Sequence, residues 1–252
     1  KSQIEFEFDK KLIKFEKIFC TSTPRRIVLL LEGLVDKGED EMIIRKGPKA
    51  SSAFINGTPT KAAVGFANSL GIDVDDLEIE NTEKGGFVFG KKVRKGESTR
   101  TSLSLIIPKV IKSLQGPRFM KWGNGNFKFS RPIRWLVSIY NDEILDFNLD
   151  ECDPKIVVGN LSKSHRLIDR VIEINSPDNY FEILAENGVL VKREERKEKI
   201  MNFINQSSES LNLKPDLSEE LLNELSDLVE FPNVITGKFD EEFLDLPVEV
   251  LS

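Results

Sequence analysis

The sequence predicts an α+β fold, in which mixed or antiparallel sheets are packed by helices. Three observations support this class. The run Ile27–Leu31 is apolar and rich in β-branched and leucine residues, as in a strand. Leu77–Ile79 and Phe87–Phe89 flank a glycine-containing turn, which is typical of a hairpin. Apolar residues recur at helical spacing in Thr60–Leu70 and Ser98–Leu114.

Length and composition indicate an ordinary globular protein. The 252 residues, of which 39% are hydrophobic and 31% charged, are enough for one domain or two lobes. We expect lobes at 1–150 and 151–252. No apolar run approaches the length of a membrane span, and the chain begins at Lys1 without a signal-peptide core, so we expect a cytoplasmic fragment of a longer protein.

The first third of the chain alternates strands, turns and helices. Lys10–Phe19 has a mixed pattern that fits a helix passing into a strand, and Ile27–Leu31 should be a central strand paired with Met42–Arg45. Gly47-Pro48 and Asn56–Pro59 are predicted turns. The helix Thr60–Leu70 is predicted to be capped by Thr60 and ended by Gly71. Pro108 within the predicted helix Ser98–Leu114 implies either a kink or a later start of the helix.

The stretch Pro117–Tyr140 organises the protein. It holds both tryptophans, and it lies in a window, Ser98–Asn141, that has no acidic residue although the whole chain carries a net charge of -6. Gly123–Asn126 predicts a turn, after which Phe127–Phe129 alternates apolar and basic side chains as a strand does. The window contains eight basic residues: Arg100, Lys109, Lys112, Arg118, Lys121, Lys128, Arg131 and Arg134.

These basic residues allow two interpretations. In one, the aromatic residues form core and the bases are only their solvated face. In the other, the bases bind the phosphates of a nucleic acid. The same choice applies to Arg25-Arg26, a phosphate clamp or the polar mouth of a strand, and to His165-Arg166. The candidate nucleic-acid-binding residues are Arg25, Arg26, Arg118, Lys121, Lys128, Arg131, Arg134, His165 and Arg166.

The second half is predicted as strands and then helices. Strands are expected at 144–149, 156–159, 171–174, 189–191 and 234–235. One helix should begin at an N-cap at Ser176, a second should cover the charged segment 192–204, and a third should cover 217–229 with a cap at Ser218. Residues 207–210 should form a loose connection between the second and the third. From Met201 onward twelve acids face two lysines, so this part should pack on the basic lobe, meet a partner or point away.

Several kinds of chemistry find no support in the sequence. Gly85, Gly86 and Gly90 lack the Gly-Lys-Ser/Thr ending of a phosphate loop. Two cysteines and one histidine, His165, are too few for a zinc site, and no nucleophile elbow accompanies that histidine. We therefore predict neither a catalytic residue nor a metal in this chain.

The segment M-K-W-G-N-G-N-F-K-F-S-R-P-I-R-W-L-V resembles the β subunit of bacterial heterotetrameric glycyl-tRNA synthetases. T-P-R-R-I-V-L-L-L-E-G-L, K-G-P-K-A-S-S-A-F and L-V-E-F-P-N-V-I-T-G-K-F-D-E-E-F-L-D-L-P match in the same order. At residues 163–166 this chain has K-S-H-R where the family usually has R-G-H-R. The resemblance implies tRNA(Gly) and an α subunit as partners in an α2β2 heterotetramer, with ATP bound by the α subunit and no cofactor here. It also implies similarity to the editing-like B3/B4 module of phenylalanyl-tRNA synthetase.

Two functional hypotheses follow from the resemblance. In the first, the chain helps to hold tRNA(Gly) for aminoacylation. In the second, it is a non-catalytic scaffold that docks the α subunit or the rest of the β subunit. A third, hydrolytic editing, lacks an evident catalytic set.

Overall fold

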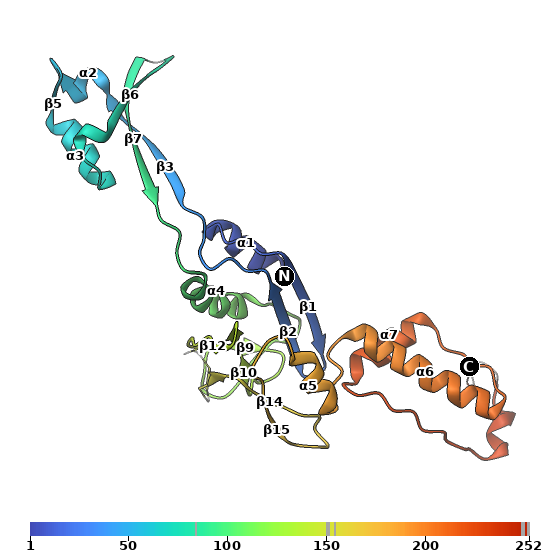
Figure 1. Cartoon of the computed structure of the whole chain (residues 1–252). Coiled ribbons are helices and arrows are strands. Elements are labelled where there is room, and N and C mark those ends of the chain that lie inside the picture. The colour runs from blue at the N-terminus through green and yellow to red at the C-terminus, as the bar shows by residue number, and fades with distance from the viewer. Residues whose placement is uncertain (84, 150–151, 154, 248–249, 251–252) are drawn as a thin grey trace. The chain divides into compact units, whose positions relative to one another are not determined.

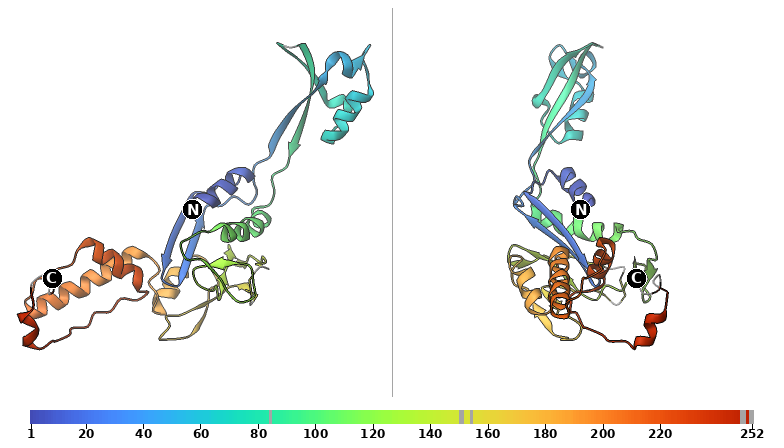
Figure 2. Two further views of the ribbon diagram at one scale, coloured as in Figure 1. Left: turned by 180° about the vertical axis from the view of Figure 1, so that it is seen from behind. Right: turned by 90° about the vertical axis from the view of Figure 1, so that its right-hand side faces the viewer.

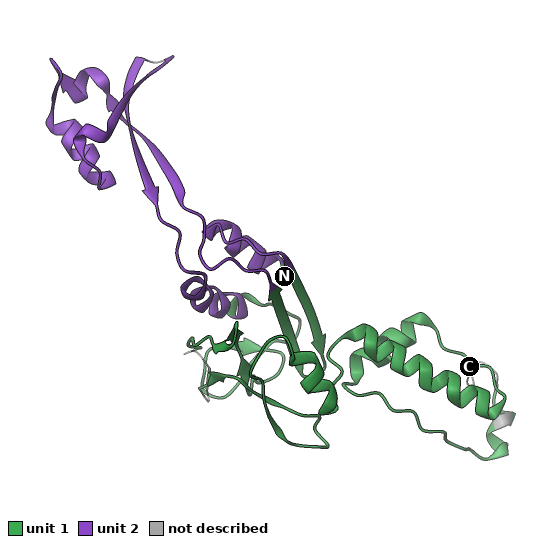
Figure 3. Ribbon diagram, in the orientation of Figure 1, with its two compact units in different colours: residues 1, 18–31, 112–252 green, residues 2–17, 32–111 purple. Residues whose placement is uncertain are grey.

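The computed structural model describes residues 1–83, 85–149, 152–153, 155–247 and 250. It has the predicted α+β class, with helices and small, mostly antiparallel sheets (Figure 1). The similarity to the phenylalanyl-tRNA synthetase module stays a prediction. The chain divides into two compact units, Ser2–Lys17 with Glu32–Ile111 and Ile18–Leu31 with Lys112–Ser252 (Figure 3). The lobe boundary predicted between residues 150 and 151 lies outside the described residues.

One unit, 2–17 with 32–111, is built on the antiparallel sheet β3-β7-β6, formed by β3 (Glu41–Lys49), β7 (Gly85–Arg94) and β6 (Leu77–Thr82). The β6–β7 hairpin confirms the prediction from sequence. The predicted partner of Ile27–Leu31 was wrong, because Met42–Arg45 pairs with β7 instead.

Gly47-Pro48 is not a turn, as predicted, but part of β3. The register shifts there, between Lys46 and Lys49, where proline has no N–H to give to the ladder. A Cβ at Gly47 would lie 2.5 Å from the ring of Phe66, so the glycine lets a helix pack closely on the strand.

That helix is α3 (Lys61–Leu70), and its predicted ends are confirmed. The Thr60 hydroxyl accepts a hydrogen bond from the Ala62 N–H at 3.3 Å, and Gly71 ends the helix at a φ of 66°. The predicted turn Asn56–Pro59 is confirmed only at Asn56 and Gly57, with φ values of 51° and 80°, because Thr58–Pro59 form β5, which pairs with β4 (Phe54–Ile55). The 3-10 helix η1 (Val74–Asp76) leads from α3 into β6.

The core of this unit lies between the sheet and the helices α2 (Ala50–Ala53) and α3. Ala53, Ala63 and Val88 are fully buried there. Side chains alternate along a strand, so Met42, Ile44 and Val93 point away from Val88, and they are 62%, 55% and 54% exposed. This face of the sheet thus exposes three apolar side chains, beside charged ones such as Lys91, which lies opposite Ile44.

Ion pairs join α1 (Ser2–Lys11) to α4 (Thr99–Ser113) and to the segment that leads into α4. Lys109 Nζ lies 2.7 Å from Glu7, and Lys11 Nζ lies 2.7 Å from Glu97. These pairs lower the pKa of both carboxyl groups, mainly through the hydrogen bonds from Lys109 to Glu7 and from Lys11 to Glu97. The helix α4 confirms the prediction for this segment and contains Pro108.

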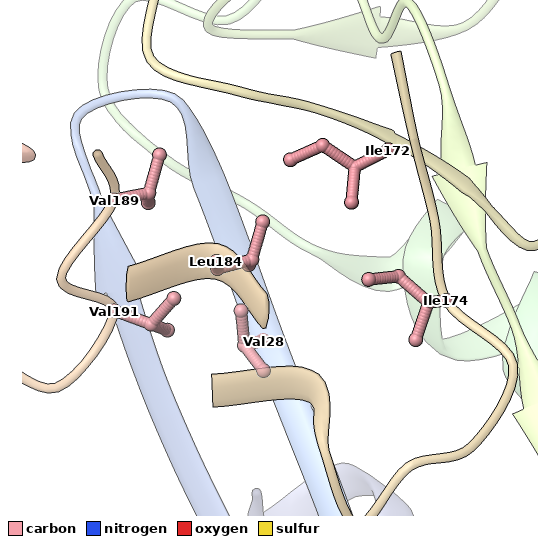
Figure 4. Close-up of a cluster of buried hydrophobic side chains, with 6 residues drawn as sticks. All are labelled: Val28, Ile172, Ile174, Leu184, Val189 and Val191. Atoms are coloured by element: carbon pink, nitrogen blue, oxygen red, sulfur yellow. The ribbon is translucent and has the colours of Figure 1, made fainter. Parts of the chain in front are cut away.

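The other unit, 18–31 with 112–252, includes the hairpin of β1 (Lys17–Thr23) and β2 (Arg26–Glu32). We predicted a central strand here, but β2 belongs to a two-stranded sheet with β1. Its apolar run has an inside and an outside, since Val28 is 9% exposed and Ile27 is 67% exposed. Val28 packs with residues of α5 (Tyr180–Glu186) and neighbouring segments, which gather around that helix: Ile172, Ile174, Leu184, Val189 and Val191 (Figure 4).

Short strands complete this part of the chain. They are β8 (Met120–Lys121), β9 (Lys128–Phe129), β10 (Leu136–Val137), β11 (Ile139–Tyr140), β12 (Glu143–Ile144), β13 (Val158–Gly159), β14 (Leu161–Lys163) and β15 (Val171–Glu173). The pair β10–β13 is parallel, and the other pairs are antiparallel. Three predictions were wrong: the segment 144–149 is a strand only at Ile144, residues 189–191 form no strand although Val189 and Val191 are buried, and α5 has its N-cap at Asn179 rather than Ser176.

The helices α6 (Arg193–Leu211) and α7 (Glu219–Leu228) run side by side (Figures 1 and 2). Arg193 at the start of α6 donates two hydrogen bonds of 2.7 Å to Asp227 near the end of α7, which shows that the two helices are antiparallel. The predicted cap is confirmed, with the Ser218 hydroxyl accepting from the Leu221 N–H at 3.1 Å.

Two further predictions for this part were wrong. Residues 207–210 do not loosen the chain, because α6 continues through them to Leu211. The segment 234–235 is not a strand, and its Ile235 is 91% exposed.

Arg196 fastens this helix pair to the rest of its unit. Its side chain is fully buried and donates to backbone carbonyls of Ser226, Leu190 and Val191 at 2.8 Å and of Ser22 at 3.0 Å. Burial lowers the pKa of Arg196. A buried charge is tolerated when its donors are satisfied, as they are here.

Candidate nucleic-acid interface

The β8–β9 hairpin carries the most basic part of the sequence. Lys121 and Lys128 are directly opposite each other in the register, and both are exposed. Like charges placed opposite each other destabilise a sheet, so this pair is a local cost that an anion between the lysines would relieve. Three more exposed bases belong to the same stretch. We call Arg118, Lys121, Lys128, Arg131 and Arg134 the basic stretch.

Aromatic rings support the hairpin. The Phe129 ring contacts two others, with centroid distances of 5.0 Å to the Phe119 ring and 5.9 Å to the Phe127 ring. The Trp122 indole N–H donates to the Phe129 carbonyl at 2.9 Å and so ties the two strands together. These four side chains are half-buried while the bases are exposed, which is the alternation that the sequence predicts.

Asp153 holds the turn of this hairpin in place. Its Oδ2 accepts from the Asn124 N–H at 3.0 Å, and Gly123 adopts a φ of 60°. A Cβ at Gly123 would lie 2.4 Å from the Asp153 carbonyl oxygen, so glycine is required here both for its φ and for the close approach. Asp153 was not among the sequence candidates, since nothing local to it marks the contact.

Arg25 and Arg26 have different environments. Arg25 lies in the two-residue turn of the β1–β2 hairpin and is exposed. Arg26 is 7% exposed, and its guanidinium forms an ion pair with Glu230 and donates to the Lys163 carbonyl. The Thr23 hydroxyl donates to the same Glu230 carboxylate at 2.7 Å. Because Arg26 offers no accessible donor here, we leave it out of the interface proposed below.

The buried Arg26 also brings other candidates together. Its guanidinium carbon lies 5.6 Å from the centre of the Trp135 ring, and Arg134 precedes that tryptophan in the chain. Since the same guanidinium reaches the Lys163 carbonyl, the segments that hold Arg25, Arg134 and Lys163 meet around it.

His165 belongs to the loop that joins β14 to β15. Its ring Nδ1 accepts a hydrogen bond from the backbone N–H of Leu167 at 3.4 Å, and its backbone N–H donates to the carbonyl of Asn187 at 3.0 Å. The ring is half-buried, and Arg166 beside it is exposed. Gly188, at a φ of 73°, allows close packing, since a Cβ there would lie 3.1 Å from the His165 Cβ.

The loop also contains a residue that sequence reasoning missed. Arg170 is exposed, and its N–H donates to the buried Ser164 hydroxyl at 2.7 Å, which closes the loop. The signal was present in S-H-R-L-I-D-R, where a second arginine follows Arg166 four positions later.

The acidic end of the chain contributes to the fold of this unit. Glu230 pairs with Arg26, and Asp227 pairs with Arg193, whose hydrogen bonds lower the pKa of Asp227. Of the three expectations for this segment, packing on the basic lobe is met at Glu230. Tyr180 lies close to that pair, and burial, with the charge of Glu230, raises its pKa to about 12.

The described residues contain neither a candidate metal site nor a candidate membrane span. No group of three or more histidine, cysteine, aspartate or glutamate side chains there is arranged to hold a metal ion. Within the same residues, every helix is too short or too polar to cross a membrane. Exposed bases on an aromatic support are typical of proteins that bind nucleic acid.

Comparison with known proteins gives the family. The family model described as "Glycyl-tRNA synthetase beta subunit" matches residues 1–252, so the chain belongs to this family. It is 46% identical over 230 residues to the glycine–tRNA ligase beta subunit of Trichodesmium erythraeum, covering 91% of this chain and 32% of that protein. The corresponding protein of Clostridioides difficile is 36% identical over 253 residues, which cover 100% of this chain and 36% of the relative. The chain thus spans about a third of the length of these relatives.

Proposed function

We propose that this chain is the part of a glycine–tRNA ligase beta subunit that holds the phosphate backbone of tRNA(Gly). Charging would take place together with an α subunit, which would bind glycine and ATP in an α2β2 enzyme. Membership of the glycyl-tRNA synthetase beta subunit family supports a role in tRNA charging, and the exposed basic stretch supports binding of tRNA as the part played by this chain.

The observation that carries the proposal is the pair Lys121 and Lys128. The two lysines lie opposite each other on an exposed hairpin, inside a window of eight bases and no acid. The two like charges repel each other and so lower the stability of the hairpin, whereas a phosphate binds well between two ammonium groups. Phosphate contacts position an RNA without reading its sequence, so this surface would hold many tRNAs alike.

The test is the salt dependence of tRNA binding. If about four bases of the basic stretch meet phosphates, log affinity should fall with log salt at a slope of about -3.6, and Lys121→Glu/Lys128→Glu should reduce it to roughly half. The matched control is Lys214→Glu/Lys238→Glu, which makes the same charge change at two exposed lysines of the acidic end. Equal slopes for wild type and the folded hairpin variant would refute the proposal.

A specific observation favours the scaffold alternative. Met42, Ile44 and Val93 are exposed apolar side chains on one face of the sheet, with Met42 directly opposite Val93, and exposed apolar side chains that lie together are the kind that protein partners cover. If docking is the function, Met42→Lys/Ile44→Lys should prevent assembly with the α subunit in size-exclusion chromatography. The lysine-to-glutamate pair on the hairpin should then leave tRNA binding intact.

A further inference from the structure

A pocket opens beside the β8–β9 hairpin. It has a volume of about 460 Å³ and lies between the residues that follow α4 and the hairpin strands. Its lining includes Lys112, Gln115, Phe119, Asn126, Phe127 and Lys128. The volume falls in the range of roughly 300–1,000 Å³ that small-molecule sites occupy.

The apolar part of the lining is aromatic. Phe119 and Phe127 each pack against Phe129 and also line the pocket, so the cluster that supports the hairpin also forms a wall of this hollow. Gly116 keeps the Phe119 ring close to the chain, since a Cβ at Gly116 would lie 2.5 Å from that ring. Aromatic rings in a basic surface stack with any nucleobase, because every base has a π face.

The polar part of the lining suits the rest of a nucleotide. Lys112 and Lys128 bring positive charge to the rim, and Lys128 belongs to the surface proposed above. The side-chain amides of Gln115 and Asn126 carry both donors and acceptors, as base edges do. Lys121 Nζ donates to Asn126 Oδ1 at 3.1 Å, which connects this amide to the lysine pair.

A second pocket, on α6, differs from the hairpin pocket in the charge of its lining residues. It has a volume of about 320 Å³ and contains an aromatic ring, Phe203, but its rim carries Glu195 and Glu198 beside Lys199. Two carboxylates there repel a phosphate, whereas the hairpin pocket has lysines and no acid among its lining residues.

We propose that the hairpin pocket receives a single unstacked base of the RNA bound by the basic stretch. This inference rests on the proposed function and adds a contact to the base, where the lysines contact only the backbone. Recognition of RNA by stacking an unpaired base on phenylalanine is a mode that helical RNA cannot use. The pocket would therefore favour a nucleotide in a loop or at an end.

The experiment compares two oligomers of equal phosphate count, fluorescently labelled octauridylate and an eight-residue abasic ribose-phosphate chain. Anisotropy titration of the whole chain should show tighter binding of octauridylate, by on the order of 5- to 100-fold. Phe127→Leu, which removes the ring and keeps an apolar side chain, should abolish this ratio and leave the affinity for the abasic oligomer unchanged. Phe203→Leu on α6 is the matched control and should change neither.

Each outcome decides between the two proposals. Equal affinity of wild type for both oligomers would overturn the pocket and leave the phosphate surface standing. If neither oligomer binds, the phosphate surface itself is wrong, and the pocket falls with it. Should Phe127→Leu not fold, Gln115→Ala/Asn126→Ala replaces two exposed side chains and must lower the ratio; an unchanged ratio overturns the proposal.

Discussion

The ion pair between Arg26 and Glu230 should be the most sensitive point of the fold. Both side chains are 4% exposed, and the pair joins residues 204 positions apart in the chain. The perturbation is Glu230→Gln, which keeps the shape of the side chain and removes its charge. The variant leaves the Arg26 guanidinium buried without a counter-ion.

The magnitude follows from burial. Removing one partner of a buried pair costs about 3–5 kcal/mol, because the remaining charge is neither solvated nor compensated. Glutamine still accepts from the Thr23 hydroxyl, which now holds Glu230 at 2.7 Å, so the lower part of the range is expected. Arg26 has little to fall back on, since its Nε is already buried without an acceptor among the described residues.

Urea unfolding followed by tryptophan fluorescence measures this, with Trp135 stacked near Arg26 as a local reporter. Asp227→Asn is the matched control, because it breaks the ion pair with Arg193, whose side chains are 37% and 56% exposed. The double variant Arg26→Met/Glu230→Leu should recover most of the loss. A loss for Glu230→Gln no larger than that for Asp227→Asn would refute the reasoning.

Three other predictions are open to direct measurement. Tyr180→Phe should resist alkaline unfolding. Burial raises the Tyr180 pKa to about 12, so between about pH 10 and 12 the phenol loses its proton in the unfolded chain and keeps it in the folded one. The free energy of unfolding of wild type should therefore fall by about 2–3 kcal/mol over this range, and that of the variant should not. Parallel stability curves would contradict it. His165→Gln should change tRNA affinity by about 0.5–1.5 kcal/mol, the worth of one hydrogen bond; a hundredfold loss of deacylation in the same variant would instead indicate editing. The chain alone should give no glycine-dependent ATP–pyrophosphate exchange, because the proposal assigns activation to the α subunit, and robust exchange would disprove it.

Local signals predicted the elements whose ends are fixed by local chemistry. Thr60 and Gly71 bound a helix because a hydroxyl cap and a left-handed glycine act on their own neighbours. The β6–β7 and β8–β9 hairpins follow in the same way from their turns. In each case the residues that determine the structure are close in sequence.

Pairing over long distances could not be predicted. An apolar run such as Ile27–Leu31 fits a central strand equally well, and only the tertiary packing shows that β2 has one partner and an exposed outer face. The serine-rich end of α6 was misjudged for a related reason. Serine is a weak helix former, but Ser210 donates to the carbonyl of Ser207 at 2.8 Å and stays in the helix.

The candidate site shows the same division between local and distant effects. Alternation along Phe127–Phe129 correctly placed a lysine on the surface above phenylalanines, since side-chain direction in a strand is a local property. Asp153, which holds the hairpin turn, could not be found in this way because it lies 29 positions from Asn124.

Arg25 and Arg26 show why a count of basic residues overstates a binding surface. The two neighbours have the same chemistry, yet Arg25 lies in the turn and is exposed, whereas Arg26 is the first residue of β2 and its side chain is buried in the unit. Glu230 supplies the charge that makes the inward position tolerable, and it comes from the acidic end of the chain. The pair with Glu230 thus makes Arg26 unavailable to a ligand. It also connects the start of β2 to β14, through the Lys163 carbonyl, and to the segment after α7. Lys121 and Lys128 form no ion pair with an acid among the described residues, and they are therefore the bases at which we expect an RNA phosphate to bind most strongly.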